Sequence, residues 1–338
     1  MMDLFTNEDL PQGVPADAGE SPLTITRATP EWVFDGLKGM LQPRVLFRLD
    51  NHGGRYYYCY DDNGKVKIFR GVTSFISEVL PKSEHLIKWA ADMGYEESKI
   101  ELDFRADYGT YMHTKILEMA AVGGVDLGKN LEAETRERLM ALGHSPRLHT
   151  QAWTDDIRND ILAFAQWVRD FEVQFVAFEM PLASDTIGLA GSIDLVCIMN
   201  AKAYTDKTPV EKRERVKAIV DFKSGRKGFY ESHELQLAVY RKIWNENFPG
   251  FPVTRVFNWS PKEWKTSPTY NFTDQTDKAS DALINNLLEV YRLRKAISGK
   301  TIRPVWEFAG RIKAGDDPAS FFKVTDIEVY LENNKSSL

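Results

Sequence analysis

The sequence predicts an α/β fold in which a central mixed β-sheet is flanked by helices and a small antiparallel β-meander precedes it. Three observations favour this class. Apolar runs bounded by glycine and polar residues occur at 175–180, 187–199 and 218–222, as expected for buried strands. Longer segments carry apolar residues at helical spacing. Three short tyrosine- and valine-rich runs before residue 70 are separated by turn residues, which is typical of a meander.

Length and composition suggest one large domain with appendages. The chain has 338 residues, of which 43% are hydrophobic and 12% aromatic, enough for a substantial core. The first residues are rich in Pro, Gly, Asp and Glu and show no period, so we expect a flexible tail. The expected divisions are a tail at 1–30, the meander at 31–70, the main α/β core at 71–300 and a C-terminal appendage at 301–338.

Charge and cysteine content exclude some classes. The formal net charge of −6 argues against a generally basic nucleic-acid binder, although a local positive groove remains compatible with it. The two cysteines, Cys59 and Cys197, are too few for the four thiolates of an iron–sulfur cluster. Neither an apolar run of about 20 residues nor a signal-peptide pattern is present, so we expect a cytoplasmic protein with no membrane partner.

The meander is expected to contain three strands, at 45–49, 56–60 and 65–69, joined by turns at 51–54 and 61–64. Its tyrosines are expected to pair across the strands, with stacking on nucleic-acid bases as the alternative.

Helices are expected along much of the remaining chain. The segments are 71–93 (broken at Pro81), 96–122 (with a possible interruption at Gly109), 131–142, 155–171, 231–245 and 281–297. A further strand is expected at 253–259, followed by a loop with an exposed Trp264. His144 and His149 are expected to be solvated in a loop. The basic stretch at 201–217 is expected to be a loop that either contacts DNA or is simply solvated.

Two apolar runs each deliver an acid near their end. Asp221 and Lys223 are two residues apart, so in a strand they point to the same face. Asp194 joins them if its strand is the neighbour. Two carboxylates that lie close together repel one another unless a cation sits between them, and Mg²⁺ prefers such an oxygen-rich setting.

These residues and two further patterns resemble the PD-(D/E)XK nuclease superfamily, in its RecB-like exonuclease branch. The patterns are Asp194, then Asp221-x-Lys223, then Gln236-x-x-x-Tyr240 on a helix, with an upstream Gly109-Thr110-x-x-His113. The resemblance covers about residues 71 to 260. It implies a restriction-endonuclease-like core and a metal-dependent DNA exonuclease of DNA processing, recombination or repair. A stand-alone chain of this kind is similar to nucleases encoded by bacteriophages, which would act in the host cytoplasm.

The resemblance also implies roles for individual residues. The implied ligands of Mg²⁺ or Mn²⁺ are His113, Glu179, Asp194, Asp221 and the backbone carbonyl of Phe222. Lys223 would orient or deprotonate the attacking water and stabilise developing negative charge; a nearby cation is expected to depress its pKa. Gln236 would hydrogen-bond near the site and Tyr240 would contact the DNA strand, because residues four apart share a helix face.

Two alternatives remain open. One is an endonuclease with the same core, and the other is a DNA-binding or assembly protein without turnover. DNA is the expected partner, with a single-strand-binding or recombination protein as a second candidate. The sequence has no Gly-x-x-x-x-Gly-Lys-Ser/Thr phosphate loop, so a motor activity is not expected. Polarity, strand preference and oligomeric state are left open.

Overall fold

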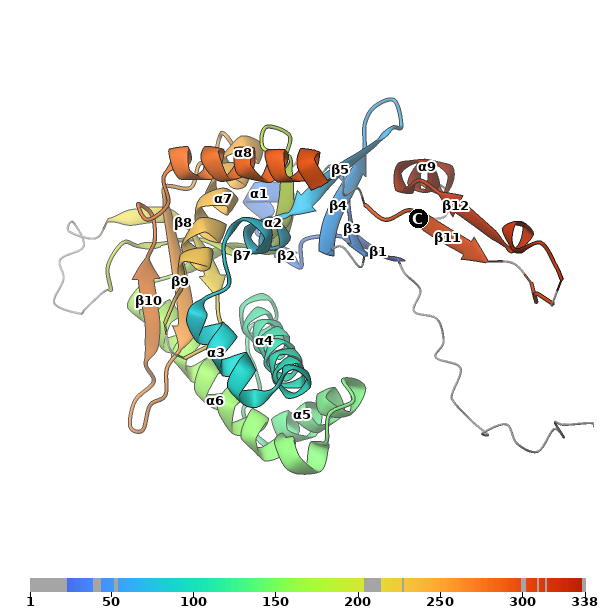
Figure 1. Cartoon of the computed structure of the whole chain (residues 1–338). Helices are drawn as coiled ribbons and strands as arrows, with labels where there is room; N and C mark the ends of the chain where they lie inside the picture. Colours follow the sequence, from blue (N-terminus) through green and yellow to red (C-terminus); the bar gives the residue numbers. More distant parts are fainter. Residues whose placement is uncertain are drawn as a thin grey trace, which may run out of the picture.

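The computed structural model describes residues 23–38, 44–51, 54–203, 214–226, 228–298, 302–308, 310–313 and 315–335. In this part of the chain, ten strands form one mixed sheet with helices on both faces (Figure 1). The predicted α/β class is therefore confirmed. Residues 1–22 of the tail expected at 1–30, and residues 204–213 of the basic stretch, lie outside the described residues.

The elements follow the predicted order. The strands of the large sheet are β1 (Leu23–Ala28), β2 (Trp32–Val33), β3 (Leu46–Asn51), β4 (Gly54–Tyr60), β5 (Val66–Gly71), β6 (Gln174–Ser184), β7 (Leu189–Asn200), β8 (Arg215–Phe222), β9 (Arg255–Pro261) and β10 (Tyr270–Asp274). The helices around it are α1 (Asp35–Lys38), α2 (Val72–Val79), α3 (Glu84–Met93), α4 (Tyr95–Ala121), α5 (Lys129–Ala141), α6 (Pro146–Asp170), α7 (Glu231–Asn247) and α8 (Asp281–Ser298).

Strand β7 joins two halves of the sheet. One of its edges pairs antiparallel with β6. On the other edge, Leu189 and Ala190 pair in parallel with β5, whereas β8 pairs antiparallel from Leu195 onward. Residues 191–194 lie between these two pairings. The sheet therefore divides at this point into a β1–β3–β4–β5 side and a β8–β9–β10 side (Figure 1).

Helices pack on both faces because the strands carry apolar side chains on both. One core contains residues of α2, α7 and α8, including Phe75, Trp244 and Leu288, packed on strand residues such as Ile219. The other contains residues of α4, α5 and α6, such as Met112 and Phe164, packed on Leu195 and Val220. Strands that are buried on both faces consist of nearly continuous apolar residues, and for this reason they could be predicted from the sequence.

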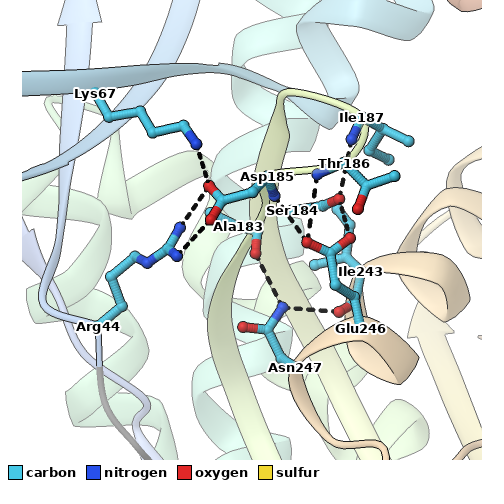
Figure 2. Close-up of polar contacts among 10 residues, drawn as sticks. All are labelled: Arg44, Lys67, Ala183, Ser184, Asp185, Thr186, Ile187, Ile243, Glu246 and Asn247. Atoms are coloured by element: carbon cyan, nitrogen blue, oxygen red, sulfur yellow. Dashed lines mark hydrogen bonds and ion pairs between the residues drawn. The ribbon is translucent and has the colours of Figure 1, made fainter. Parts of the chain in front are cut away.

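The meander is a continuation of the large sheet, not a separate unit. Arg70 and Gly71 at the end of β5 pair with β7, so the expected boundary at residues 70 and 71 falls inside one sheet. Polar contacts also anchor it (Figure 2): the carboxylate of Asp185, in the turn between β6 and β7, binds Arg44 and Lys67 of the meander region. The same turn is held to the end of α7, where Glu246 accepts the backbone N–H of Asp185 at 2.8 Å.

The tyrosines of the meander pack within the protein, in agreement with the expectation that they pair across the strands. Tyr58 stacks on Phe47 with 5.0 Å between ring centroids, and Tyr56, Tyr57 and Tyr58 are all buried. Base stacking by these rings is therefore not supported.

The C-terminal segment covers the outer face of the meander. It contains a hairpin of β11 (Val305–Phe308) and β12 (Phe322–Thr325), followed by α9 (Ile327–Asn333). Ile327 and Leu331 share a buried cluster with Leu49 and Tyr58, and the Tyr60 hydroxyl donates to the Leu331 carbonyl at 2.9 Å.

Several expectations are corrected. Residues 23–28, placed in the tail, form β1, because they pair antiparallel with β3. Helix α4 runs through Gly109 without interruption, and α6 begins at Pro146. His149 therefore lies on that helix.

The histidines and the tryptophan expected to be solvated are half-buried instead. His144 and His149 pack against the ring of Phe104, and His144 Nε2 lies 2.8 Å from Asp107 Oδ2. Trp264 donates its indole N–H to the Asn159 carbonyl at 3.3 Å. Strand β10 was not expected; Tyr270–Asp274 carry too few apolar residues to show a strand pattern.

Among the described helices, none combines the length and apolar character required to cross a membrane.

Candidate active site

A row of polar side chains crosses four neighbouring strands beside the division of the sheet. Phe178 pairs with Leu195 and Met180 with Ile193, which sets Glu179 opposite Asp194. The next pairing sets Asp194 opposite Asp221, because Leu195 pairs with Val220. Asp221 in turn pairs with Asn258 of β9. Residues opposite one another in a sheet share a face, so the sequence prediction that Asp194 and Asp221 converge agrees with this register.

Three of the predicted metal ligands form a compact cluster. Ligand atoms of His113, Glu179 and Asp194 all lie within 4.8 Å of one another. His113 Nδ1 is 3.1 Å from Glu179 Oε1. Helix α4 supplies the histidine and β6 and β7 supply the acids. An imidazole with two carboxylates is a donor set that suits a divalent cation, so this cluster could hold a metal ion.

The backbone of Glu179 adopts a rare conformation. Its φ is 46°, in the left-handed region that residues with a side chain seldom adopt. Such residues in a strand are commonly found where a side chain is re-aimed near a functional site. Here the departure coincides with the strand position that directs a carboxylate at His113.

The charges of the cluster are strongly coupled. Burial and the neighbouring Asp221 carboxylate raise the pKa of Asp194 to about 7. Burial alone lowers the pKa of His113, but Asp194 and Glu179 outweigh it and raise that pKa to about 9. The carboxylates thus require positive charge beside them, which is the requirement that a divalent ion meets. Asp194 also accepts the backbone N–H of Phe222 at 2.7 Å.

Asp221 is held by donors of the protein, not by the cluster. It is 1% exposed, and its two oxygens lie 3.0 and 2.8 Å from the Lys223 ammonium. Asn258 Nδ2 donates to Asp221 Oδ2 at 2.7 Å, and Gln275 Nε2 donates to Asn258 Oδ1 at 3.2 Å. Asp221 thus lies outside the three-residue cluster, and its expected role as a metal ligand stays a prediction. The same holds for the Phe222 carbonyl, whose residue contacts Asp194 through its amide N–H.

The groups around Lys223 shift its pKa in opposite directions, and the expected depression beside a bound cation stays a prediction. Burial lowers the pKa of this ammonium, but Asp221 and Asp194 outweigh it, so the pKa is raised above its ordinary value. Lys223 is therefore a cation at neutral pH. Its arrangement suits stabilisation of negative charge better than removal of a proton from water.

Helix α7 adds the two residues predicted from their spacing. Gln236 Oε1 accepts from Lys223 Nζ at 3.2 Å, and Gln236 Nε2 donates to the Tyr240 hydroxyl at 3.4 Å. Tyr240 packs against Gly191, where an added Cβ would lie 2.8 Å from Tyr240 Cε1. A glycine is needed there because the ring occupies the space of a side chain.

The row opens into a cleft of about 840 Å³ between α4 and the meander. His113, Glu179, Asp194, Lys223 and Gln236 all line it. The site therefore has room for a substrate beside the metal cluster.

Sequence reasoning missed two supports of the site. Asn258 orients Asp221; the signal was a polar residue inside the apolar run Val256–Trp259. Arg226 anchors the loop after Lys223, because its guanidinium lies 3.0 Å from Asp160 Oδ1 on α6. No local pattern indicates this pair, since the two residues are far apart in sequence.

No protein-family model matches the chain, and a search of curated proteins gives no match either.

Proposed function

We propose that the chain is a metal-dependent nuclease that hydrolyses phosphodiester bonds in DNA. The observation that carries the proposal is the juxtaposition of a metal-competent cluster with a half-buried lysine that directly follows the end of β8. An ordinary structural ion pair does not require a histidine and two further acids beside it. The PD-(D/E)XK resemblance of the sequence supports the same reading and favours the exonuclease mode.

His113, Glu179 and Asp194 are the residues that would hold the metal, with Mg²⁺ or Mn²⁺ as the proposed ion. Their oxygen and imidazole donors suit either. The bound ion would supply Lewis-acid polarisation of the phosphate and a more acidic water.

The remaining residues have roles that follow from their contacts. Lys223 stabilises the negative charge that develops on the phosphate oxygens during attack by water. Asp221 and Gln236 hold the lysine in place through contacts of 2.8 and 3.2 Å. Asn258 fixes Asp221 in turn. The products are a free hydroxyl and a terminal phosphate, formed as water adds to phosphorus and the P–O bond to the leaving sugar breaks.

An endonuclease is the second candidate, because the same chemistry at the cleft would cut internal bonds. The observation that admits it is the cleft itself, whose lining extends from the metal cluster to residues of the meander. Recombination, repair or phage DNA processing is the proposed setting, with a single-strand-binding or recombination protein as a candidate partner.

The experiment is digestion of linear and circular DNA that carries separate labels at the 5′ and 3′ ends, with Mg²⁺ and with EDTA. We expect metal-dependent loss of label from linear DNA, which gives the polarity. Cutting of circles would favour the endonuclease. DNA binding without cleavage in Mg²⁺ would favour the non-catalytic alternative and contradict the proposal.

A further inference from the structure

The lining of the cleft extends beyond the metal cluster. Another of its walls is a face of the meander, where Arg48 of β3 and Arg55 of β4 line the same cavity. Their side chains are 39% and 41% exposed, so they are accessible from the cleft. Tyr57 and Thr26 lie on the same sheet face, and Arg27 and Glu31, of opposite charge, also line the cavity.

The two arginines share one acid. Asp50 Oδ2 lies 2.6 Å from Arg48 Nε, and Asp50 Oδ1 lies 3.3 Å from Arg55 Nε. Two guanidinium groups against one carboxylate leave a net positive charge on this wall. Both contacts engage Nε alone, and a planar guanidinium has further donors suited to the oxygens of a phosphate.

Arg55 is held firmly at this position. Its backbone N–H donates to the Ser74 hydroxyl at 3.1 Å. Its carbonyl oxygen would lie only 2.8 Å from a Cβ atom added at Gly71. The absence of a side chain at Gly71 thus lets the end of β5 approach β4 closely. These contacts fix the backbone from which the Arg55 side chain extends at the cleft.

The cleft offers little aromatic surface. Among the described lining residues, the aromatic rings other than His113 belong to Tyr57, Phe222 and Tyr240, which are 4%, 3% and 4% exposed. Bases therefore find little ring face on which to stack, in contrast to clefts that hold single strands by stacking. Contact with a polynucleotide at this wall is then through its phosphates, which carry no sequence information.

We infer that the meander is the second substrate-binding wall of the nuclease: Arg48 and Arg55 bind backbone phosphates of the DNA strand whose scissile phosphate lies at the metal cluster. This inference rests on the proposed function, since it needs DNA as the substrate. It gives the meander a binding role and makes strand capture independent of base sequence. Asp50 lowers the positive charge of this wall, because its carboxylate offsets one of the two guanidinium charges.

The test measures binding of a fluorescein-labelled 20-nucleotide oligo(dT) by anisotropy, with EDTA present so that no strand is cut. We expect the double variant R48A/R55A to bind about tenfold more weakly, because charged hydrogen bonds to phosphate are lost. The slope of the logarithm of the binding constant against the logarithm of salt concentration should become shallower by about 1.4, which is about 0.7 for each lost phosphate contact of a single strand.

A second variant moves the result in the opposite direction. Asp50→Asn removes the negative charge that Arg48 and Arg55 share, so the oligonucleotide should bind more tightly and its binding should depend more steeply on salt. This variant guards against a simple folding defect, since a misfolded protein would not bind more tightly. Arg292→Ala is the matched control, because Arg292 is 61% exposed on α8 and outside the lining of the cleft.

The outcomes distinguish failure of the inference about Arg48 and Arg55 from failure of the proposed nuclease function. If the wild type cuts and binds DNA while R48A/R55A binds like Arg292→Ala, the inference is wrong and the proposed function stands. If the wild type neither binds nor cuts DNA, the proposed function fails and the inference fails with it. Weaker binding of Asp50→Asn than of the wild type would also contradict the inference.

Discussion

At the scale of single residues, Asp194 is the position where the charges of the site meet. It faces Asp221 across the sheet, shares a metal-competent cluster with His113, and accepts a backbone N–H from Phe222. Both oxygens of its neighbour Asp221 accept from protein donors. The two neighbouring carboxylates therefore have different contacts: Asp194 belongs to the metal-competent cluster, and Asp221 binds Lys223.

Asn258 is the residue whose loss should disturb this division most selectively. It is fully buried, and Asn258→Ala removes a donor to Asp221 at 2.7 Å. Because a buried acceptor loses a partner, we expect the free energy of unfolding to fall by about 1–3 kcal/mol and cleavage to slow. Chemical denaturation measures the first effect. Asn130→Ala, on an exposed helix position, is the control; equal stability of the two variants would contradict this role.

Gly191 gives a second prediction at this scale. In Gly191→Ala the new Cβ would meet Tyr240 Cε1 at 2.8 Å, so the ring must move. Overpacking of this kind costs about 1–3 kcal/mol, and the displaced ring should also disturb Gln236. We expect lower stability and slower cleavage than in Gly250→Ala, where nothing lies within 4 Å of the added atom. A Gly191→Ala protein that matches the control in both measurements would show that the ring has room to adjust.

At the scale of elements, the site exists because β7 changes partners. Its first residues pair with β5 and its later residues with β8, and Gly191 to Asp194 lie between. Helix α4 reaches this point from one face of the sheet and α7 from the other. The turn between β6 and β7 must then be fixed against the meander, and the Asp185 contacts in Figure 2 provide this link.

The Asp185 link should depend on pH. Hydrogen bonding from Arg44, with Lys67 also adjacent, holds the pKa of Asp185 at about 2, below its ordinary value of 3.8. A carboxyl whose pKa is lower in the folded state contributes stability above its unfolded pKa and loses it as pH falls through the folded pKa. We therefore expect the stability difference between wild type and Asp185→Asn to shrink as pH falls from 3.8 towards 2. Urea denaturation across this range measures it; a constant difference would contradict the link.

At the scale of the whole molecule, the order of helices and strands was predictable because buried strands and amphipathic helices leave strong local patterns. The convergence of Asp194, Asp221 and Lys223 was predictable from the two-residue spacing of Asp221 and Lys223 and from the expectation that the two apolar runs form neighbouring strands. The way the meander joins the sheet was not, since the pairing of Gly71 with Ala190 joins residues far apart in sequence. For the same reason, the arginine wall of the cleft has no sequence pattern.

Metal binding should be visible in the stability of the intact chain. A ligand that binds only the folded state stabilises it, by about 2.7 kcal/mol at 100 times its Kd. We expect Mg²⁺ or Mn²⁺ to raise the Tm of the wild type, and to have little effect on Glu179→Gln, which removes one charge from the cluster. Thermal denaturation with and without metal measures this effect. An equal rise in both proteins would place the bound ion elsewhere.

The most direct test of the account is the rate of cleavage of end-labelled linear DNA as a function of Mg²⁺ concentration, for the wild type and for Lys223→Ala. We predict no cleavage in EDTA, saturation of the wild-type rate with metal, and a saturated rate about 10²–10³-fold lower in the variant. The metal concentration at half-saturation should stay similar, because the lysine lies outside the three-residue cluster. Cleavage by Lys223→Ala at the wild-type rate, or cleavage by the wild type in EDTA, would contradict the central claim that this site is a metal-dependent nuclease.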